Sequence, residues 1–483
     1  MQTLVLLVVG LLLVQLYFLA PKPFKPLVVL APALVAGIAF LFFPKGVFSV
    51  GHLLVVLLTV SVLLPHIPLP AGLPRMRLEQ PIIVSVWLML AAVAVLRHKY
   101  FTVVVPPPAR VLFLLILYIG FSIGYGGLVL GNDISGRDFF ENLKSFVYLL
   151  IFLFVSSNYI DKNDFWKFFK YLFIIFSISA LFGIFQRYNL LGINGYLTPL
   201  YAQGRHLAAV AGRGHRIVGT SPNPNEFGGL MVLTATVSLS IVLLVPHWKR
   251  RLFGLGLFCL FGYTLILTQS RTSLVALAVS LFVLLFVLYP FSRGFGSLFA
   301  ALMPLGIFAA LGAVAVWLFV PDAILDRFAQ LGRVWEATSF LARVAKWGGQ
   351  YASWMESPLF GHGPGKLVLV GGDSEWLLFL RRYGLIGTGL LILFGASIFR
   401  GLGRIARRVG RDMPELRAYC LGLQATLFGF AAYMIPANVY HSLWLFPIYM
   451  LSLGMAFSFW PEARSSARPV GRAPAPTGLP SLQ

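Results

Sequence analysis

The sequence is poor in charged residues. Lys, Arg, Asp and Glu make up 11% of the 483 residues, whereas a soluble domain carries about 25%. Hydrophobic residues reach 58% and the mean hydropathy is +0.84, which excludes a soluble globular domain. The apolar residues form runs of about 20, long enough to cross a bilayer core of about 30 Å. A membrane β-barrel would show alternating segments of about ten residues instead. The composition therefore predicts an all-α polytopic membrane protein.

Cysteine, metal-ligand patterns and nucleotide-binding motifs are also scarce. The two cysteines, Cys259 and Cys420, both lie in apolar runs and form neither a disulfide framework nor a metal-site spacing. His215 and His362 lie in polar segments without a second ligand at metal spacing. The sequence contains no P-loop, no GxSxG and no dinucleotide fingerprint. We expect no cofactor and no metal.

Acidic residues are few, and the excess of basic residues is large. The chain has 38 Lys and Arg against 16 Asp and Glu, a net charge of +22. No soluble basic domain is present to hold nucleic acid, so we expect no nucleic-acid partner. Two membrane interpretations fit the charge: cytoplasmic loops that follow the positive-inside rule, and a site for an anionic, phosphate-bearing substrate.

The apolar runs predict about 12–14 transmembrane helices, and we find no internal repeat. The N-terminal run lacks a basic n-region and a cleavage site, so we expect it to be retained as a first helix. The expected spans lie near residues 1–20, 27–43, 52–69, 81–97, 110–130, 145–160, 165–185, 226–246, 252–268, 272–290, 298–320, 376–399, 416–436 and 439–460.

Basic loops predict the orientation. The segments 247–251 and 400–417 are strongly basic and should be cytoplasmic. The tail 461–483, rich in Arg, Pro, Ala and Ser, should be a disordered cytoplasmic end. Alternation of the spans then places two long segments, about 186–225 and about 321–375, on the outside.

The two outside segments carry arginines on the side that the positive-inside rule disfavours, which indicates a ligand. These arginines are Arg187, Arg205, Arg213 and Arg216 in the first segment, and Arg327, Arg333 and Arg343 in the second. The second segment also contains an apolar stripe at helical spacing, formed by Phe340, Val344, Trp347, Tyr351 and Trp354. This stripe predicts an amphipathic helix that lies flat on the membrane surface.

The stretch HRIVGTSPNPNEF, from His215, indicates a phosphate-binding corner. Asn225 is placed to cap the helix that begins at Glu226. The N-terminus of that helix and Arg216 would together favour a diphosphate. A capped helix end beside a solvated cation is the alternative interpretation.

Two further arginines are candidates for substrate binding. Arg271 falls in a very short outside turn between two apolar spans, where a charge is costly and marks a site. Snorkelling of its side chain to the interface is the alternative. Arg343 lies beside the aromatic stripe of the predicted surface helix, where a binding role and a plain surface charge are both open.

Two carboxylates, Asp373 and Glu375, lie where the second outside segment re-enters the membrane. Either could act as general base for an attacking hydroxyl within hydrogen-bond reach. The alternative is a helix start, with Asp373 or Ser374 as N-cap and Glu375 favouring the helix dipole.

The order of these features resembles the O-antigen ligase and Wzy-type O-antigen polymerase superfamily over roughly residues 165–450. The resemblance rests on RIVGTSPNPNEFGG, QSRTSLVAL, a long outside loop with SPLFGHGPG, and a re-entry segment ending in Gly384-x-x-Gly387. It implies a GT-C-like membrane glycosyltransferase in the bacterial inner membrane, whose active site faces the periplasm. It also implies a metal-independent, inverting transfer from undecaprenyl-diphosphate-linked oligosaccharide.

Carried over by position, the resemblance assigns Arg216, Arg271 and Arg343 to the arginines of the family. Ligases place a histidine where this chain has Asp373, and an acidic residue is more typical of the polymerase branch. The resemblance therefore implies a polymerase of O-antigen or related surface polysaccharide, with a chain-length regulator as a possible partner. An O-antigen ligase that transfers the glycan to lipid A–core or to protein is one alternative, and a transporter of the same lipid-linked sugars is another.

The predicted organisation has three parts. Residues 1–164 would form N-terminal transmembrane helices, residues 165–460 the catalytic membrane domain, and residues 461–483 the cytoplasmic tail. Asp373, Glu375 and Arg271 are the expected catalytic residues, and Arg216, Arg271, Arg343 and Asn225 the expected substrate-binding residues.

Overall fold

A computed structural model describes residues 50–65, 80, 82–84, 103–157, 162–202, 204–211, 216–290, 338–365, 373–410 and 412–461. These residues form helices joined by turns, and no strand occurs among them. In chain order the helices are α3 (Val50–Leu63), α5 (Pro107–Leu128), α6 (Gly136–Ser157), α7 (Lys162–Tyr188), η2 (Leu190–Gly192), α8 (Ile193–Tyr196), α9 (Thr198–Tyr201), α10 (Arg205–Ala211), α11 (Pro224–Leu244), α12 (Trp248–Thr268), α13 (Arg271–Phe282), η3 (Val283–Leu288), α17 (Thr338–Glu356), α18 (Glu375–Arg408), α19 (Pro414–Tyr433) and α20 (Leu445–Phe457).

Seven of these helical segments are long and apolar enough to cross a bilayer, so the predicted all-α polytopic membrane class is confirmed. They are α5, α6, the Phe165–Tyr188 part of α7, α11, α12, α13 continued through η3, and α18. The predicted spans 1–20, 27–43 and 298–320 and most of 81–97 lie outside the described residues, as does the tail from residue 462. The predicted total of 12–14 spans therefore stays a prediction.

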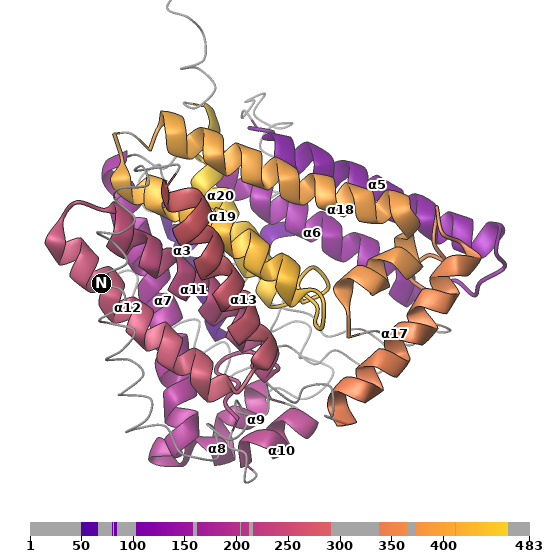
Figure 1. Ribbon diagram of the computed structural model, residues 1–483, viewed down its shortest axis with the longest axis horizontal. Coiled ribbons are helices and arrows are strands. Elements are labelled where there is room, and N and C mark those ends of the chain that lie inside the picture. The colour runs from indigo at the N-terminus through magenta and orange to yellow at the C-terminus, as the bar shows by residue number, and fades with distance from the viewer. Residues whose placement is uncertain are drawn as a thin grey trace, which may run out of the picture.

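Helix α11 forms the centre of the bundle, packed against α12, α13 and α19 (Figure 1). Nearly all of its residues are buried, because its apolar side chains cover every face of the helix. Its hydroxyls are satisfied locally: Thr234, Thr236 and Ser238 each donate to the carbonyl four residues earlier. A polar side chain can therefore lie in the bundle without an unpaired donor.

Helices α5 and α6 complete the bundle by packing against α18 and α20. The predicted division at residue 164 thus separates helices that lie in contact. The N-terminal helices consequently contribute side chains to the region around the start of α18.

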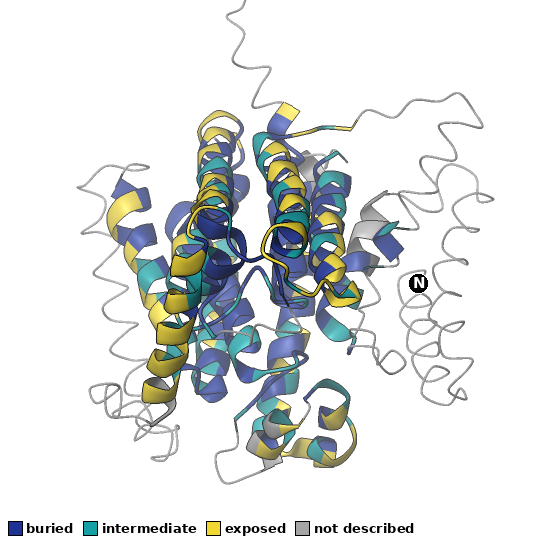
Figure 2. Cartoon of the chain, turned by 90° about the vertical axis from the view of Figure 1, so that its right-hand side faces the viewer, coloured by how far each residue is buried: buried dark blue, intermediate teal, exposed yellow. Residues whose placement is uncertain are grey.

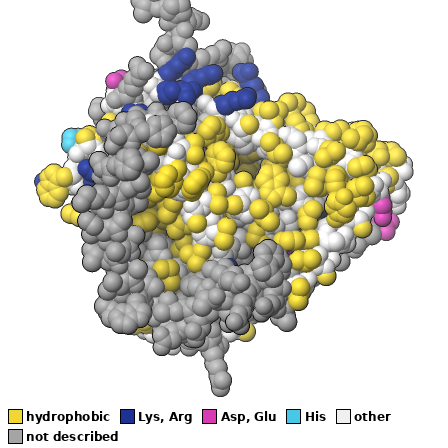
Figure 3. All heavy atoms as spheres, viewed as in Figure 1, with side chains coloured by type: hydrophobic (Ala, Val, Ile, Leu, Met, Phe, Trp, Pro, Cys, Tyr) yellow, Lys and Arg dark blue, Asp and Glu magenta, His cyan; other side chains and the backbone are white. Residues whose placement is uncertain are grey.

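The helices define two ends of the bundle. We call one the basic end, where α12 begins with Trp248-Lys249-Arg250-Arg251 and α18 ends with Arg407-Arg408. We call the other the site end, where α6, α11, α13 and α18 begin. In Figure 3 the described face is largely apolar between these ends, and the Lys and Arg side chains gather at one edge.

The first predicted outside segment consists largely of short helices at the site end. After α7 ends at Tyr188, the chain forms η2, α8, α9 and α10 in succession. Asn189 and Leu191 adopt positive φ angles of 48° and 58° there, which lets the chain turn sharply after the long helix. Residues 212–215 lie outside the described part, and the chain re-enters it at Arg216.

Helix α17 lies beside the bundle in contact with α18, and the predicted amphipathic helix is present (Figure 1). Val344 and Tyr351 of the predicted stripe are 43% and 52% exposed, and Leu341 and Met355 add to the same surface. Figure 2, which faces this side, shows α17 with mainly exposed residues. An exposed apolar stripe of this kind suits a helix at a membrane surface.

A kink in α18 receives the loop that follows α17. Gly384 has φ 62° and ψ −165°, a region essentially restricted to glycine. The kink leaves the carbonyls of Arg381 and Arg382 open, and these accept from the backbone N–H groups of His362 and Gly363 at 2.9 and 2.8 Å. The Ser122 hydroxyl on α5 also donates to the Arg382 carbonyl, at 2.9 Å.

Gly384→Ala should unfold this junction. A Cβ at Gly384 would lie 2.2 Å from the Leu359 carbonyl oxygen, and the backbone angles would be strained as well. We expect a loss of more than about 2 kcal/mol in the free energy of unfolding, measured by thermal or denaturant unfolding of the protein in detergent. Gly389→Ala is the matched control on the same helix, since a Cβ there meets nothing within 4 Å. Equal stabilities for the two variants would contradict the structural role of Gly384.

Candidate functional site

Arg216 is held at a corner between α11 and α12. Its Nε donates to the Thr268 carbonyl at 3.1 Å, and its Nη2 donates to Asn225 Oδ1 at 3.3 Å. The prediction that Asn225 caps α11 is wrong. Asn223 is the N-cap, and its side chain accepts from the backbone N–H groups of Asn225 and Glu226. The proline at position 224 fits the first helical position because it needs no donor there, so the helix begins earlier than predicted.

The N-cap of α11 belongs to a wider polar network. Asn223 Nδ2 donates to Glu226 Oε1 at 2.7 Å, and Asn223 Oδ1 accepts from the Glu226 N–H at 2.9 Å, so the side chains of the two residues are held together. The other oxygen of Glu226 accepts from the Ser442 hydroxyl at 2.8 Å. This contact ties the start of α11 to the segment between α19 and α20.

Arg271 begins α13 directly after a turn made by Gln269 and Ser270, as the sequence predicts. The N-terminus of α13 lies against α11 because Gly228 leaves room: a Cβ there would be 2.3 Å from Ser273 Oγ. Ser273 Oγ donates to the Asn225 carbonyl at 3.4 Å. Arg271 therefore projects from the helix that borders the Arg216–Asn225 corner, three positions after the carbonyl that Arg216 binds.

Asp373 lies at the rim of the site end beside two cations of α17. Its Oδ2 is 3.8 Å from Arg343 Nε and 3.7 Å from Lys346 Nζ. The Asp373 side chain is 38% exposed, so it stays within reach of a ligand. Ser374 caps α18 by accepting from the Leu377 N–H at 3.5 Å, which confirms one of the two predicted N-cap candidates and leaves the Asp373 carboxylate to face the cations.

Glu375 is fully buried and holds the segment between α19 and α20. Its carboxylate accepts from the Val439 N–H at 2.6 Å and contacts His441 Nδ1. The second ring nitrogen of His441 is 3.4 Å from Glu141 Oε2 on α6. Lys144 donates to that same oxygen of Glu141 at 2.7 Å. Two carboxylates, one lysine and one imidazole therefore form a buried polar cluster across three parts of the chain.

Burial lowers the pKa of the His441 imidazole, and the nearby charges of Glu375 and Glu141 oppose that shift. A neutral imidazole can donate from one nitrogen only. Nδ1 of His441 faces Glu375, and Nε2 lies 3.4 Å from Glu141 Oε2. The cluster thus holds the imidazole in one orientation between two carboxylates.

Arg381 and Arg382 are buried next to the kink of α18, each 4% exposed. Among the described residues, Nε and Nη2 of Arg381 and Nε of Arg382 have no hydrogen-bond partner. Buried guanidinium N–H groups without an acceptor are costly. These two side chains therefore provide unfilled donors close to the site.

Several of the site residues predicted from the sequence lie at one end of the bundle. Arg216, Arg343 and Glu375 all act electrostatically on Tyr433 of α19, as does Glu226, which was not predicted as a site residue. Arg216 and Asn225 are in contact, and Arg343 contacts Asp373. Glu375 faces inward to His441 instead of sharing the exposed rim with Asp373.

Such an arrangement of arginines and carboxylates is chemically able to bind an anion next to a proton acceptor. Arginine stays charged and binds phosphate oxygens in pairs. Among the described residues, no group of three or more His, Cys, Asp or Glu side chains has the arrangement of a metal site. Comparison of the sequence with protein-family models and with curated proteins gives no match.

His441 should make stability depend on pH. Burial keeps its pKa below the value of about 6.5 in the unfolded chain, so the unfolded state binds more protons as pH falls through 6.5. The folded state should therefore lose stability from about pH 7 downward. In unfolding measurements across this range, His441→Gln should show a shallower loss than the unchanged protein. Identical pH slopes would contradict a neutral, buried His441.

Proposed function

We propose that the chain is a glycosyltransferase that joins undecaprenyl-diphosphate-linked oligosaccharide units into a surface polysaccharide of the O-antigen type. The observation that carries this proposal is the corner at the site end, where Arg216 and Asn225 meet the first turn of α13 with Arg271. An accessible carboxylate, Asp373, lies at the same end. The diphosphate leaving group needs positively charged donors such as arginines, and the acceptor hydroxyl needs a base such as a carboxylate.

The arginines would bind the donor. Arg216 and Arg271 would hold the diphosphate of the growing chain, and the N-termini of α11 and α13 would add favourable dipoles. The unfilled donors of Arg381 and Arg382 favour an anionic ligand at this end. Because guanidinium groups stay charged, they would stabilise the departing diphosphate directly, so the proposed transfer is metal-independent.

The carboxylates would have separate roles. Asp373 is exposed enough to reach a substrate, so it would take the proton of the acceptor hydroxyl. Glu375 is buried on His441 and the Val439 N–H, so it would position this region of the protein. The acceptor oxygen would attack the anomeric carbon, and the bond from that carbon to the diphosphate would break with inversion. The electron pair leaves with undecaprenyl diphosphate.

The charge at the two ends supports a proposed orientation and location. The basic end would face the cytoplasm under the positive-inside rule. The site end would then face the periplasm of a bacterial inner membrane, where lipid-linked oligosaccharides would be joined. Helix α17, with its exposed apolar stripe, would lie at that surface and bring Arg343 to the donor.

One observation favours a ligase as the second candidate. Ligases of the family that this sequence resembles place an imidazole near the start of this helix, and His441 brings an imidazole against Glu375. In that case His441 would serve as the base and the acceptor would be lipid A–core or a protein. The side chain of His441 is only 7% exposed, whereas Asp373 is open to a substrate, so the polymerase is the better supported proposal.

Arg271→Ala should lower polymer formation in cells by about 100-fold or more, because a donor to the departing diphosphate is lost. Arg271→Lys should recover only part of the activity, since lysine keeps the charge and loses the paired geometry. Polymer length and amount would be read from gels of the cell-surface glycan. Arg137→Ala is the matched control, an exposed arginine at the start of α6. Unchanged polymer with Arg271→Ala would rule out its role at the leaving group.

Asp373→Asn should lose activity, whereas Glu375→Gln should lose stability. Loss of a general base costs about 100- to 10,000-fold in rate, so Asp373→Asn should be well folded and nearly inactive. Glu375→Gln removes a buried charge from the cluster with His441, so it should mainly lower the thermal stability. Measuring activity and unfolding for both variants separates the roles. An active Asp373→Asn variant would transfer the role of base to another group, with His441 next to be tested.

A further inference from the structure

A cavity at the basic end is lined by four arginines. It has a volume of about 540 Å³ and lies between α18, α19 and η3. The arginines are Arg400, Arg404 and Arg407 of α18 and Arg417 of α19. This cavity is at the opposite end of the bundle from Arg216 and Asp373, so it is separate from the proposed catalytic site.

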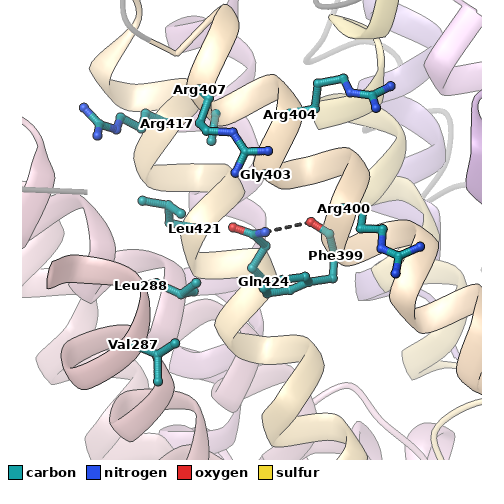
Figure 4. Close-up of a pocket in the computed structure, with 11 residues that line it drawn as sticks. Val287, Leu288, Phe399, Arg400, Gly403, Arg404, Arg407, Arg417, Leu421 and Gln424 are labelled. Carbon is teal, nitrogen blue, oxygen red and sulfur yellow. Dashed lines mark hydrogen bonds between the residues drawn. The ribbon is translucent and has the colours of Figure 1, made fainter. Parts of the chain in front are cut away.

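The arginines are arranged around the opening. In Figure 4, Arg407 points toward Gly403 and Gln424, Arg400 and Arg404 extend to one side, and Arg417 extends to the other. Gly403 leaves the space between the helices open, since a Cβ there would be 3.0 Å from Gln424 Nε2 and 3.8 Å from Arg407 Nη1. Arg407 therefore points into a space that a compact anion could fill, and the other three arginines stand at its margin.

Three of these arginines lack an acidic partner in the part of the chain that the structure describes. Within the described part of the chain, no carboxylate forms an ion pair with Arg400, Arg404 or Arg407. Arg404 instead lies over the Trp460 ring, 5.1 Å from its centroid. Arg250, at the same end of the bundle, shows the contrast, because it pairs with Glu415. The cavity thus carries positive charge that no carboxylate among the described residues pairs with at these three positions.

A buried acceptor faces the same space. Gln424 is 3% exposed and lines the cavity. Its Nε2 donates to the Phe399 carbonyl at 2.7 Å, whereas its Oε1 has no hydrogen-bond partner. A buried amide oxygen without a donor is unfavourable. A ligand that carries a hydroxyl in addition to its negative charge would satisfy it.

The remaining wall is apolar. Val287 and Leu288 come from η3, a π-helical segment, and Leu421 comes from α19. Val287 is 38% exposed, so this wall continues onto the outer apolar surface of the bundle. A ligand here would meet arginines at one side and hydrocarbon at the other, which are the two environments that a phospholipid requires.

We propose that this cavity binds an anionic phospholipid through its phosphate, with a glycerol-type headgroup toward Gln424 and an acyl chain along Val287, Leu288 and Leu421. Basic pockets between transmembrane helices are suited to anionic lipid headgroups. The arginines supply charge-assisted hydrogen bonds to the phosphate oxygens. Occupancy would hold α18 against α19 at the end where both carry positive charge.

The test is lipid binding to the full chain in detergent. Dioctanoyl phosphatidylglycerol, dioctanoyl phosphatidylcholine and inorganic phosphate would each be titrated, with bound lipid counted by native mass spectrometry and stability followed by thermal unfolding. We expect saturable binding and stabilisation with phosphatidylglycerol, and neither with phosphatidylcholine. Inorganic phosphate should bind at least 10-fold more weakly, since it lacks the contact with the apolar wall. Equal binding of the two lipids, or of phosphate and phosphatidylglycerol, would overturn the proposal.

Variants locate the site. Arg400→Gln/Arg404→Gln/Arg407→Gln should bind phosphatidylglycerol at least about 10-fold more weakly, since each lost cation weakens attraction to the phosphate. Lys249→Gln removes an exposed cation from the same end outside the cavity and should bind as the unchanged protein does. Equal loss in both variants, or no loss in the triple variant, would show that the lipid binds elsewhere. The comparison of lipids on the unchanged protein remains decisive if the triple variant does not fold.

Discussion

The structure of the site end depends on the contacts that the buried carboxylate of Glu375 makes. It begins α18, accepts from the backbone at Val439 and contacts His441, whose ring reaches Glu141 of α6. Removing one partner of this contact would leave a buried polar group without its hydrogen bond, which costs about 1–3 kcal/mol or more where the remaining group is charged. One side chain thus connects the first turn of α18 to α6 and to the segment before α20. Asp373, which lies at the exposed rim beside Arg343, comes directly before this first turn of α18 and is positioned by it.

The distribution of charge explains why the two ends of the bundle differ. At the site end, the polar side chains at the start of α11 are matched by partners: Glu226 with Asn223 and Ser442, and Arg216 with Asn225. Arg381 and Arg382 at that end keep buried donors without a partner among the described residues. At the basic end, three arginines of α18 have no acidic partner among the described residues. A membrane protein needs positive loops for orientation, whereas matched polar groups in a buried position specify a geometry. The unpaired arginines of the basic end suit contact with lipid, and the paired polar groups of the site end suit a defined substrate.

Much of the fold could be predicted from hydrophobic runs, and part of the site from isolated charges. The starts of α11, α12 and α13 were predicted to within a few residues, because each begins at a polar or proline signal and continues as an apolar run. Arg216, Arg271 and Asp373 stood out because each is a charge at the edge of such a run. The cap of α11 was assigned to Asn225 instead of Asn223, since both asparagines follow a proline in Pro222-Asn223-Pro224-Asn225 and propensity does not separate them.

The partners of Glu375 could not be found from spacing. His441 and Glu141 are 66 and 234 positions away from it, at distances that no local pattern encodes. Arg381 and Arg382 did carry a signal, since two adjacent charges inside a predicted span are costly and mark a site. The Gly384 kink was visible only as a Gly-x-x-Gly pattern. Its effect, two open carbonyls that bind the loop at His362, follows from the backbone angles alone.

The most direct test of the proposed function is a reconstituted reaction. Purified protein would receive an undecaprenyl-diphosphate-linked repeat unit from its own host, with a metal chelator present and lipid A–core absent. A ladder of longer lipid-linked glycans is the result that we predict for a metal-independent polymerase. No ladder, together with transfer once lipid A–core is added, would contradict the polymerase and make the chain a ligase.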